Sequence, residues 1–236
     1  GAAAPPDGVG GRLQRPFWRS GLRAVAADIP QAHALDAEQR CELFGLADQR
    51  IDQGGQRVAM GHDEADGFNP IARQCAEWTR QALTPDHIDA IRALPQGPTN
   101  VSDWIEICHG SPYDEDAYVL DSLDVLNAVR ATHRPLCLFG HTHAPLAVAF
   151  GDNELRFHHS EADSVLSLNS EWPYLINVGS VGQPRDGDPR AAYGIADVQQ
   201  RTVSFFRVSY DVAAAQQAIR DAGLPEALAM RLALGR

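Results

Sequence analysis

The strongest constraint on the fold is a short apolar run that ends in a glycine and two histidines. Residues 135–143 read PLCLFGHTH. A run this short predicts a buried strand rather than a helix. Side chains two positions apart in extended chain point the same way, so His141 and His143 are expected to face one point in space. Imidazole nitrogen is a common ligand of zinc, iron and manganese, so the pattern indicates a metal site; two polar residues of an ordinary loop are the alternative.

Two further stretches carry related patterns. Residues 104–112 read WIEICHGSP, an apolar strand that delivers His109 to a glycine. Residues 174–186 read YLINVGSVGQPRD, a strand followed by a glycine-rich loop. In this order, the HGSP, GHTH and NVGSVGQPRD motifs resemble those of the calcineurin-like metallophosphoesterases, in particular their small bacterial and archaeal phosphodiesterases. The resemblance extends from about residue 66 to about residue 210.

The resemblance implies a metal-dependent phosphoesterase. By the family pattern, His109 and His141 would bind one ion and His143 the other. The expected cofactor is a divalent metal, one or two ions, with manganese as the first choice and iron or zinc as alternatives. Such ions generate a hydroxide near neutral pH and stabilise the oxygens of a phosphate mono- or diester during hydrolysis. The expected partner is therefore a small phosphate ester.

The glycine-rich loop supplies candidate substrate contacts. The backbone amides around Gly179 and Ser180 could form a phosphate-facing loop, with a plain turn as the alternative. Arg185 could bind phosphate through its forked guanidinium. A loop brace between Arg185 and Asp186 or Asp188 is the competing interpretation.

The first half of the family's ligand set departs from the pattern. Residues 60–65 read MGHDEA, which is similar to the family's GNHDEA without the metal-binding asparagine. The resemblance places His62 at the substrate, as an acid or a phosphate binder. Asp28 precedes a proline where the family's D-x-H has its histidine, and Asp48 is the only approximation to the bridging aspartate. Asp28 and Asp48 are candidate metal ligands, with solvated surface carboxylates as the alternative.

Three explanations fit the missing ligands. The site is weakened, the early chain supplies substitute ligands, or the first sixty residues are not ancestral, for instance through a shifted reading frame. The first explanation leads to a rival function, a scaffold or binding protein with a weakened metallophosphoesterase fold.

The order of predicted elements indicates an α/β fold. Helices are expected over 69–82, 84–94, 121–131 and 211–223 and again from Pro225, and strands over 104–108, 135–139, 146–150, 154–158, 165–168, 174–178, 191–197 and 202–209, with a possible short strand within 21–27. Helices and strands alternate first and strands dominate later, which predicts two packed mixed β-sheets flanked by helices, as in the metallophosphoesterase sandwich. We expect residues 1–236 to form a single domain whose first 60 residues diverge from the family.

Composition excludes several other classes. The net charge of -11 argues against non-specific binding to nucleic acid, which requires a basic surface. The four cysteines form no C-x-x-C motif and are expected to be free thiols in a reducing compartment. No apolar run approaches the roughly 18–20 residues that cross a membrane, so a cytoplasmic location is expected. The sequence leaves the oligomeric state open.

Overall fold

Two β-sheets and five helices account for the regular structure of the described residues. A computed structural model describes residues 22–23, 68–93, 95 and 97–236. In spatial order, the larger sheet contains β2 (Thr99–Asn100), β3 (Ile105–Ile107), β4 (Leu136–Phe139), β8 (Tyr174–Asn177), β5 (Leu146–Gly151) and β6 (Glu154–His158). The smaller sheet contains β1 (Leu22–Arg23), β9 (Ala191–Asp197), β10 (Thr202–Val208) and β7 (Val165–Ser167). The helices are α3 (Pro70–Ala82), α4 (Pro85–Arg92), α5 (Ser122–Ala131), α6 (Val212–Asp221) and α7 (Glu226–Leu232).

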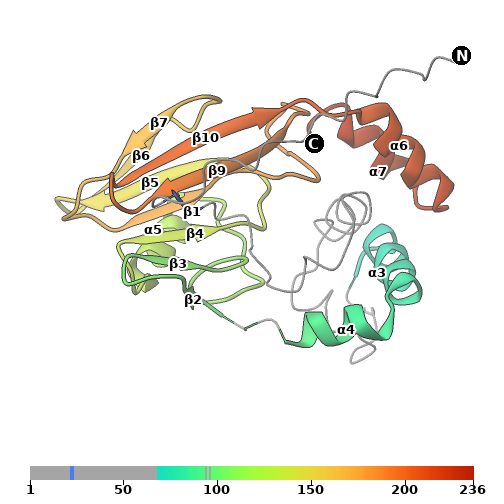
Figure 1. The fold of residues 1–236 in the computed structure, drawn as a ribbon, viewed down its shortest axis with the longest axis horizontal. Helices are drawn as coiled ribbons and strands as arrows, with labels where there is room; N and C mark the ends of the chain where they lie inside the picture. Colours follow the sequence, from blue (N-terminus) through green and yellow to red (C-terminus); the bar gives the residue numbers. More distant parts are fainter. Residues whose placement is uncertain (1–21, 24–67, 94, 96) are drawn as a thin grey trace, which may run out of the picture.

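The two sheets stack face to face, and most of the core lies between them (Figure 1). Each strand turns alternate side chains toward this interface, as the pleat requires. The buried residues shared by the two sheets are Ile105, Leu136, Ala147, Ala149, Leu168, Tyr174, Ile176, Ala196, Val203 and Phe205. This arrangement confirms the predicted α/β sandwich of two packed sheets.

Helix α5 covers the outer face of the larger sheet. Its buried side chains Val125, Ala128 and Val129 pack on Val148 and Leu175 of the strands beneath. Asp121 caps the helix, because its carboxylate accepts from the backbone N–H groups of the first turn. Both faces of the central strands are therefore buried, which explains why β4 and the first three residues of β8 carry no alternation of apolar and charged residues.

Strands β3, β4 and β8 run parallel and side by side. Ile105 pairs with Leu136, and Leu136 pairs with Tyr174, so the three strands begin in register. Their carboxyl ends therefore meet at one edge of the sheet, which carries the loops that begin at Cys108, Gly140 and Val178. The three motifs singled out from the sequence lie at this edge.

A tight hairpin joins β5 and β6. Asp152 and Asn153 both have positive φ, 55° and 62°, which is the conformation of a two-residue turn that matches strand twist. Gly151 pairs directly with Glu154 across the turn.

Helices α3, α6 and α7 pack together beside the sheets (Figure 1). Asn69 caps α3 and is followed by Pro70 at the first turn, which agrees with the helix expected over 69–82. The apolar stripe of α3 contributes Cys75 and Trp78 to a cluster that is formed mainly by α6 and α7. Gln74 joins α3 to the end of α6, because its Nε2 donates to the carbonyl of Gly223 over 3.1 Å.

Several sequence predictions lie outside the described residues. His62, Asp28 and Asp48 are among them, so their roles remain predictions. Cys75, Cys108 and Cys137 are free thiols, as expected. Among the residues that the structure describes, no helix is both long and apolar enough to cross a lipid bilayer.

Candidate metal centre

His109 and His141 meet at the carboxyl edge of the parallel strands. His109 follows β3 and His141 follows β4, and the backbone N–H of Gly140 donates to the carbonyl of His109 over 2.8 Å. The Nε2 atom of His109 and the Nδ1 atom of His141 are 3.0 Å apart. Their ring centroids are separated by 4.7 Å, with 62° between the ring planes. The structure thus brings together two of the three predicted histidines, nitrogen to nitrogen.

The conformation of the GHTH segment differs from the one predicted. His141 and His143 have φ values of 66° and 59°, in the left-handed region that β-strands do not use. The backbone N–H of Thr142 donates to the carbonyl of Gly140 over 2.7 Å, which closes a γ-turn with a positive central φ, a strained type. The prediction that extended chain aligns the two imidazoles was therefore wrong, because β4 ends at Phe139, before either histidine.

His141 is held neutral by its surroundings. Only 4% of the residue is exposed, and its ring lies 3.9 Å, centroid to centroid, from that of Tyr118. Burial, and then the positive charges that His109 and His143 would carry, lower the pKa of His141 from 6.5 to about 4. A neutral imidazole retains the lone pair that binds a metal. Within the described residues, the buried Nε2 atom of His141 has no hydrogen-bond partner.

His143 is oriented by a backbone carbonyl. Its Nδ1 lies 3.0 Å from the carbonyl oxygen of Gln183, and because a carbonyl only accepts, Nδ1 carries the proton. This hydrogen bond leaves Nε2 as the basic nitrogen, which is the tautomer and support typical of metal-binding histidines. His143 is 3% exposed.

Gln183 also links the histidines to Arg185. The Nη2 atom of Arg185 donates to Gln183 Oε1 over 2.9 Å, and the backbone N–H of Arg185 donates to the carbonyl of His143 over 3.1 Å. The two aspartates that were considered as its brace have other partners: Asp186 binds Arg207, and Asp188 binds Arg190. Arg185 is thus fixed beside His143 by Gln183.

Gly179 and Ser180 shape the loop that follows β8. Gly179 has a φ of 96°, and its N–H donates to Asn177 Oδ1 over 2.8 Å. Ser180 is 4% exposed, and its Oγ accepts from the backbone N–H of Gln183 over 2.9 Å. The Gly179 amide is therefore engaged within the protein rather than directed at a ligand.

The separation of the first two histidines is compatible with a shared ion. In the structure, His109 Nε2 and His141 Nδ1 form a hydrogen bond of 3.0 Å. Two nitrogens bound to one ion at about 2.1 Å would lie about 3.0 Å apart at the right angle of an octahedral site and about 3.4 Å apart at the tetrahedral angle of zinc, so the observed separation fits an octahedral ion such as manganese better. No three His, Cys, Asp or Glu side chains of the described residues form a complete metal-binding group. The described chain thus brings imidazoles together without closing a three-ligand site.

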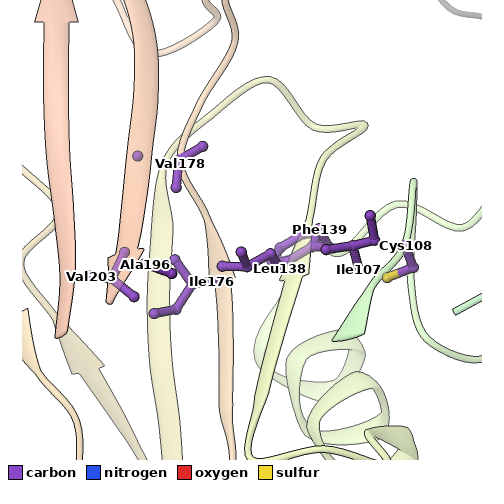
Figure 2. Close-up of a pocket in the computed structure, with 9 residues that line it drawn as sticks. Ile107, Cys108, Leu138, Phe139, Ile176, Val178, Ala196 and Val203 are labelled. Carbon is purple, nitrogen blue, oxygen red and sulfur yellow. The ribbon is translucent and has the colours of Figure 1, made fainter. Parts of the chain in front are cut away.

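An apolar cavity of about 180 Å³ lies between the sheets (Figure 2). It is lined by Ile107, Cys108, Leu138, Phe139, Ile176, Val178, Gly194, Ala196 and Val203. None of these side chains is charged, so the cavity offers no group that would bind a phosphate. The cavity therefore differs in character from the polar region around the histidines and Arg185.

Three residues of this region were given no role from the sequence. Tyr118 stacks on His141, Gln183 joins His143 to Arg185, and Asn177 lies fully buried at the end of β8. Asn177 and Gln183 lie in the NVGSVGQPRD motif. For Asn177, a polar residue at the end of an apolar strand is a sequence signal that could have pointed to a role. Tyr118 had no such signal, because it lies in an irregular loop.

Comparison with known proteins places the chain in a family. No protein-family model matches it. The uncharacterized protein MJ0912 of Methanocaldococcus jannaschii is 30% identical over 179 residues, which cover 75% of this chain and 71% of that protein. The crystal structure of a metallophosphoesterase from Sphaerobacter thermophilus matches with a TM-score of 0.66 and 37% identity, over 78% of this chain and 75% of the other. The hypothetical protein PH1004 of Pyrococcus horikoshii, at 16% identity and a TM-score of 0.58 over 78% of this chain and 71% of its own, shares the fold. The chain therefore belongs to the calcineurin-like metallophosphoesterase family.

Proposed function

We propose that the protein is a metal-dependent hydrolase of phosphate mono- or diesters, with His109 and His141 as ligands of one divalent ion and His143 as a ligand of the other. The observation that carries the proposal is the 3.0 Å approach of His109 Nε2 to His141 Nδ1. Similarity to a metallophosphoesterase supports a phosphoesterase-type function. Manganese is our first choice of metal, with iron and zinc as alternatives and one or two ions bound.

The histidines are prepared to act as neutral ligands. The lowered pKa of His141 keeps its ring unprotonated at neutral pH, and the hydrogen bond to Gln183 leaves Nε2 of His143 basic. A divalent ion bound by these rings would supply positive charge and an acidified water, both of which hydrolysis of a phosphate ester requires.

Arg185 is the proposed phosphate contact. Its guanidinium is oriented by Gln183, and an oriented guanidinium binds phosphate through a fork of N–H groups at little entropic cost. Gly179 and Ser180 are proposed to shape the loop on which Arg185 lies. His62 is proposed as the acid or phosphate binder on the basis of the family pattern.

The partner we propose is a small phosphate ester, in the cytoplasm. Asp28 and Asp48 are proposed as carboxylate ligands that would complete the ion's coordination. The free thiols of the described residues favour a reducing compartment.

A scaffold function is the second candidate. It is favoured by the lack of a complete three-ligand group within the described residues. A scaffold on this fold would bind a partner without hydrolysing an ester. The two candidates differ in metal binding and in turnover, which can be measured separately.

The test is the metal content of the full chain, measured by elemental analysis after loading with manganese and desalting. We expect wild-type protein to retain the metal and His141→Ala to lose it. His159→Ala is the matched control, because its side chain is 93% exposed, and it should retain the metal. Unchanged metal content in His141→Ala would refute the ligand assignment.

Turnover is measured on the same samples with an aryl phosphate monoester and an aryl phosphodiester. We expect hydrolysis that needs manganese and stops with a chelator. Metal retention without any turnover would favour the scaffold, and turnover that survives the chelator would contradict the proposed mechanism.

A further inference from the structure

The two histidines of the GHTH segment occupy a strained backbone conformation. For residues other than glycine, the left-handed region is unfavourable, because it brings the Cβ atom too close to a carbonyl oxygen. His141 and His143 both adopt it, with only Thr142 between them. Strain of this kind persists where surrounding contacts hold it, and it concentrates at functional sites. A residue that holds this segment in place would therefore influence the geometry of the candidate metal centre.

Asn177 provides that hold. It is the last residue of β8, it pairs with Phe139 of β4, and it is fully buried. Its Nδ2 donates to the carbonyl of Gly140 over 2.9 Å and to Thr142 Oγ1 over 2.9 Å. The two hydrogens of its amide thus bind the residues immediately before and after His141.

The other end of the Asn177 amide holds the neighbouring loop. Its Oδ1 accepts from the backbone N–H of Gly179 over 2.8 Å. The orientation of the amide is set by these partners, because the Gly140 carbonyl can only accept and the Gly179 N–H can only donate. One buried side chain therefore joins the loop that carries His141 to the loop that carries Gln183, the partner of His143.

No other standard side chain of this size replaces these bonds. Aspartate keeps the acceptor for Gly179 but turns an oxygen toward the Gly140 carbonyl, which is repulsive. Alanine removes all three bonds and leaves buried polar groups unsatisfied. Glutamine adds a methylene at a position with no exposed surface, where overpacking is costly.

We propose that Asn177 is a positioning residue of the metal centre. It holds Gly140 and Thr142 so that His141 and His143 keep their strained backbone, and it thereby sets the affinity for the ion without touching the ion. The inference rests on the proposed function, because it concerns the same ion.

The test compares manganese affinity with the stability of the metal-free protein. We expect Asn177→Asp to weaken manganese binding, measured by calorimetric titration of the full chain, by about 10–100-fold, as the loss of a residue that supports a ligand does. Thr142→Val removes only the hydrogen bond from Asn177 Nδ2 to Thr142 Oγ1, so it should weaken manganese binding less than Asn177→Asp does. Thr142→Ser keeps the hydroxyl and should bind manganese as tightly as wild type. The Thr142 variants keep the inference testable if Asn177→Asp does not fold.

Tyr174→Phe is the matched control. Tyr174 lies at the opposite end of β8, it is 1% exposed, and its hydroxyl accepts from the backbone N–H of Asn169 over 2.9 Å. We expect this variant to lower the Tm of the metal-free protein while leaving the manganese Kd unchanged.

The outcomes separate the inference from the function on which it rests. If wild-type protein binds manganese and the Asn177 and Thr142 variants bind equally well, the positioning role is refuted while the metal site stands. An equal loss of manganese affinity in Tyr174→Phe also refutes the positioning role, because the loss would then result from lower stability of the whole protein. If wild-type protein binds no manganese, the proposed function fails and this inference fails with it.

Discussion

Replacing Gly179 by alanine should destabilise the protein through two separable effects. The first is conformational, because the φ of 96° at Gly179 is unfavourable for any residue with a Cβ. The second is steric, because a Cβ built there would lie 2.7 Å from the Cβ of Ala192 and 3.2 Å from Cγ of Pro145. Both the loop and β9 lie in well-packed surroundings, so neither can move aside freely.

The expected magnitude follows from adding these effects. A residue with a Cβ in this conformation costs about 1–3 kcal/mol, and overpacking costs about 1–3 kcal/mol. The free energy of unfolding should therefore fall by roughly 2–6 kcal/mol. For a chain of this size, the Tm should fall by roughly 4–24 °C.

A double variant separates the two effects. Ala192→Gly removes the atom that the new Cβ would meet, so in the Gly179→Ala background it should relieve the steric part and leave the conformational part. Urea unfolding of the wild type, both single variants and the double variant gives the coupling energy, which we expect to be about 1–3 kcal/mol in the stabilising direction. A Gly179→Ala stability within about 0.5 kcal/mol of wild type would refute the whole argument. Strict additivity would refute the steric part.

Two further predictions follow from the pKa values of buried groups. In the metal-free protein, His141 binds a proton near pH 6.5 when the chain is unfolded but only near pH 4 when it is folded. Between these pH values the unfolded state binds more protons, so the free energy of unfolding should fall as the pH is lowered, by up to about 1.4 kcal/mol per pH unit. Urea unfolding between pH 7 and pH 5 should therefore show a steeper dependence for wild type than for His141→Ala, and equal slopes would contradict it. The pKa of Cys137 is raised by its hydrogen bond with Cys108, by burial and by the charge of Glu106. In the folded protein, iodoacetamide should therefore alkylate Cys137 much more slowly than the half-buried Cys108. Mass spectrometry of the labelled peptides checks this, and equal labelling of both thiols would be the contrary result.

Local sequence signals were sufficient for most elements of the described chain. The Asn69-Pro70 pair marks the start of α3, and the Asp152-Asn153 turn marks the β5–β6 hairpin, because each signal acts through the backbone of its own segment. Helix α4 is shorter than expected and ends at Arg92. Such boundaries depend on tertiary contacts that propensity does not contain.

The order of strands could not be read from the sequence. Strand β8 lies between β4 and β5, although β5 follows β4 directly along the chain. Which strands pair across such a distance depends on how the sheets pack, and periodicity within one strand carries no record of it. The same limit applies to the smaller sheet, where β9 lies between β1 and β10.

The sequence selected the two histidines that meet in the structure, but it did not give the conformation of their loop or the roles of Tyr118, Asn177 and Gln183. The histidines were selected because each follows an apolar strand, and the parallel pairing of β3 and β4 explains why His109 and His141 meet. Their relative orientation could not be derived, because alternation applies only while the chain is extended and β4 ends at Phe139. The metal-binding role of these histidines remains a prediction.

At the shared edge of β3, β4 and β8, the residues that stabilise the fold are different from those of the candidate site. The strands are locked in place by contacts on both of their faces, whereas the reactive groups belong to the loops that leave the strands. Loops of this kind accept substitutions and insertions that a sandwich interior would reject. Relatives with this framework could therefore diverge at exposed loop positions such as Tyr113 and Leu120, while the buried Val119 and the stacked Tyr118 of the same loop stayed as they are.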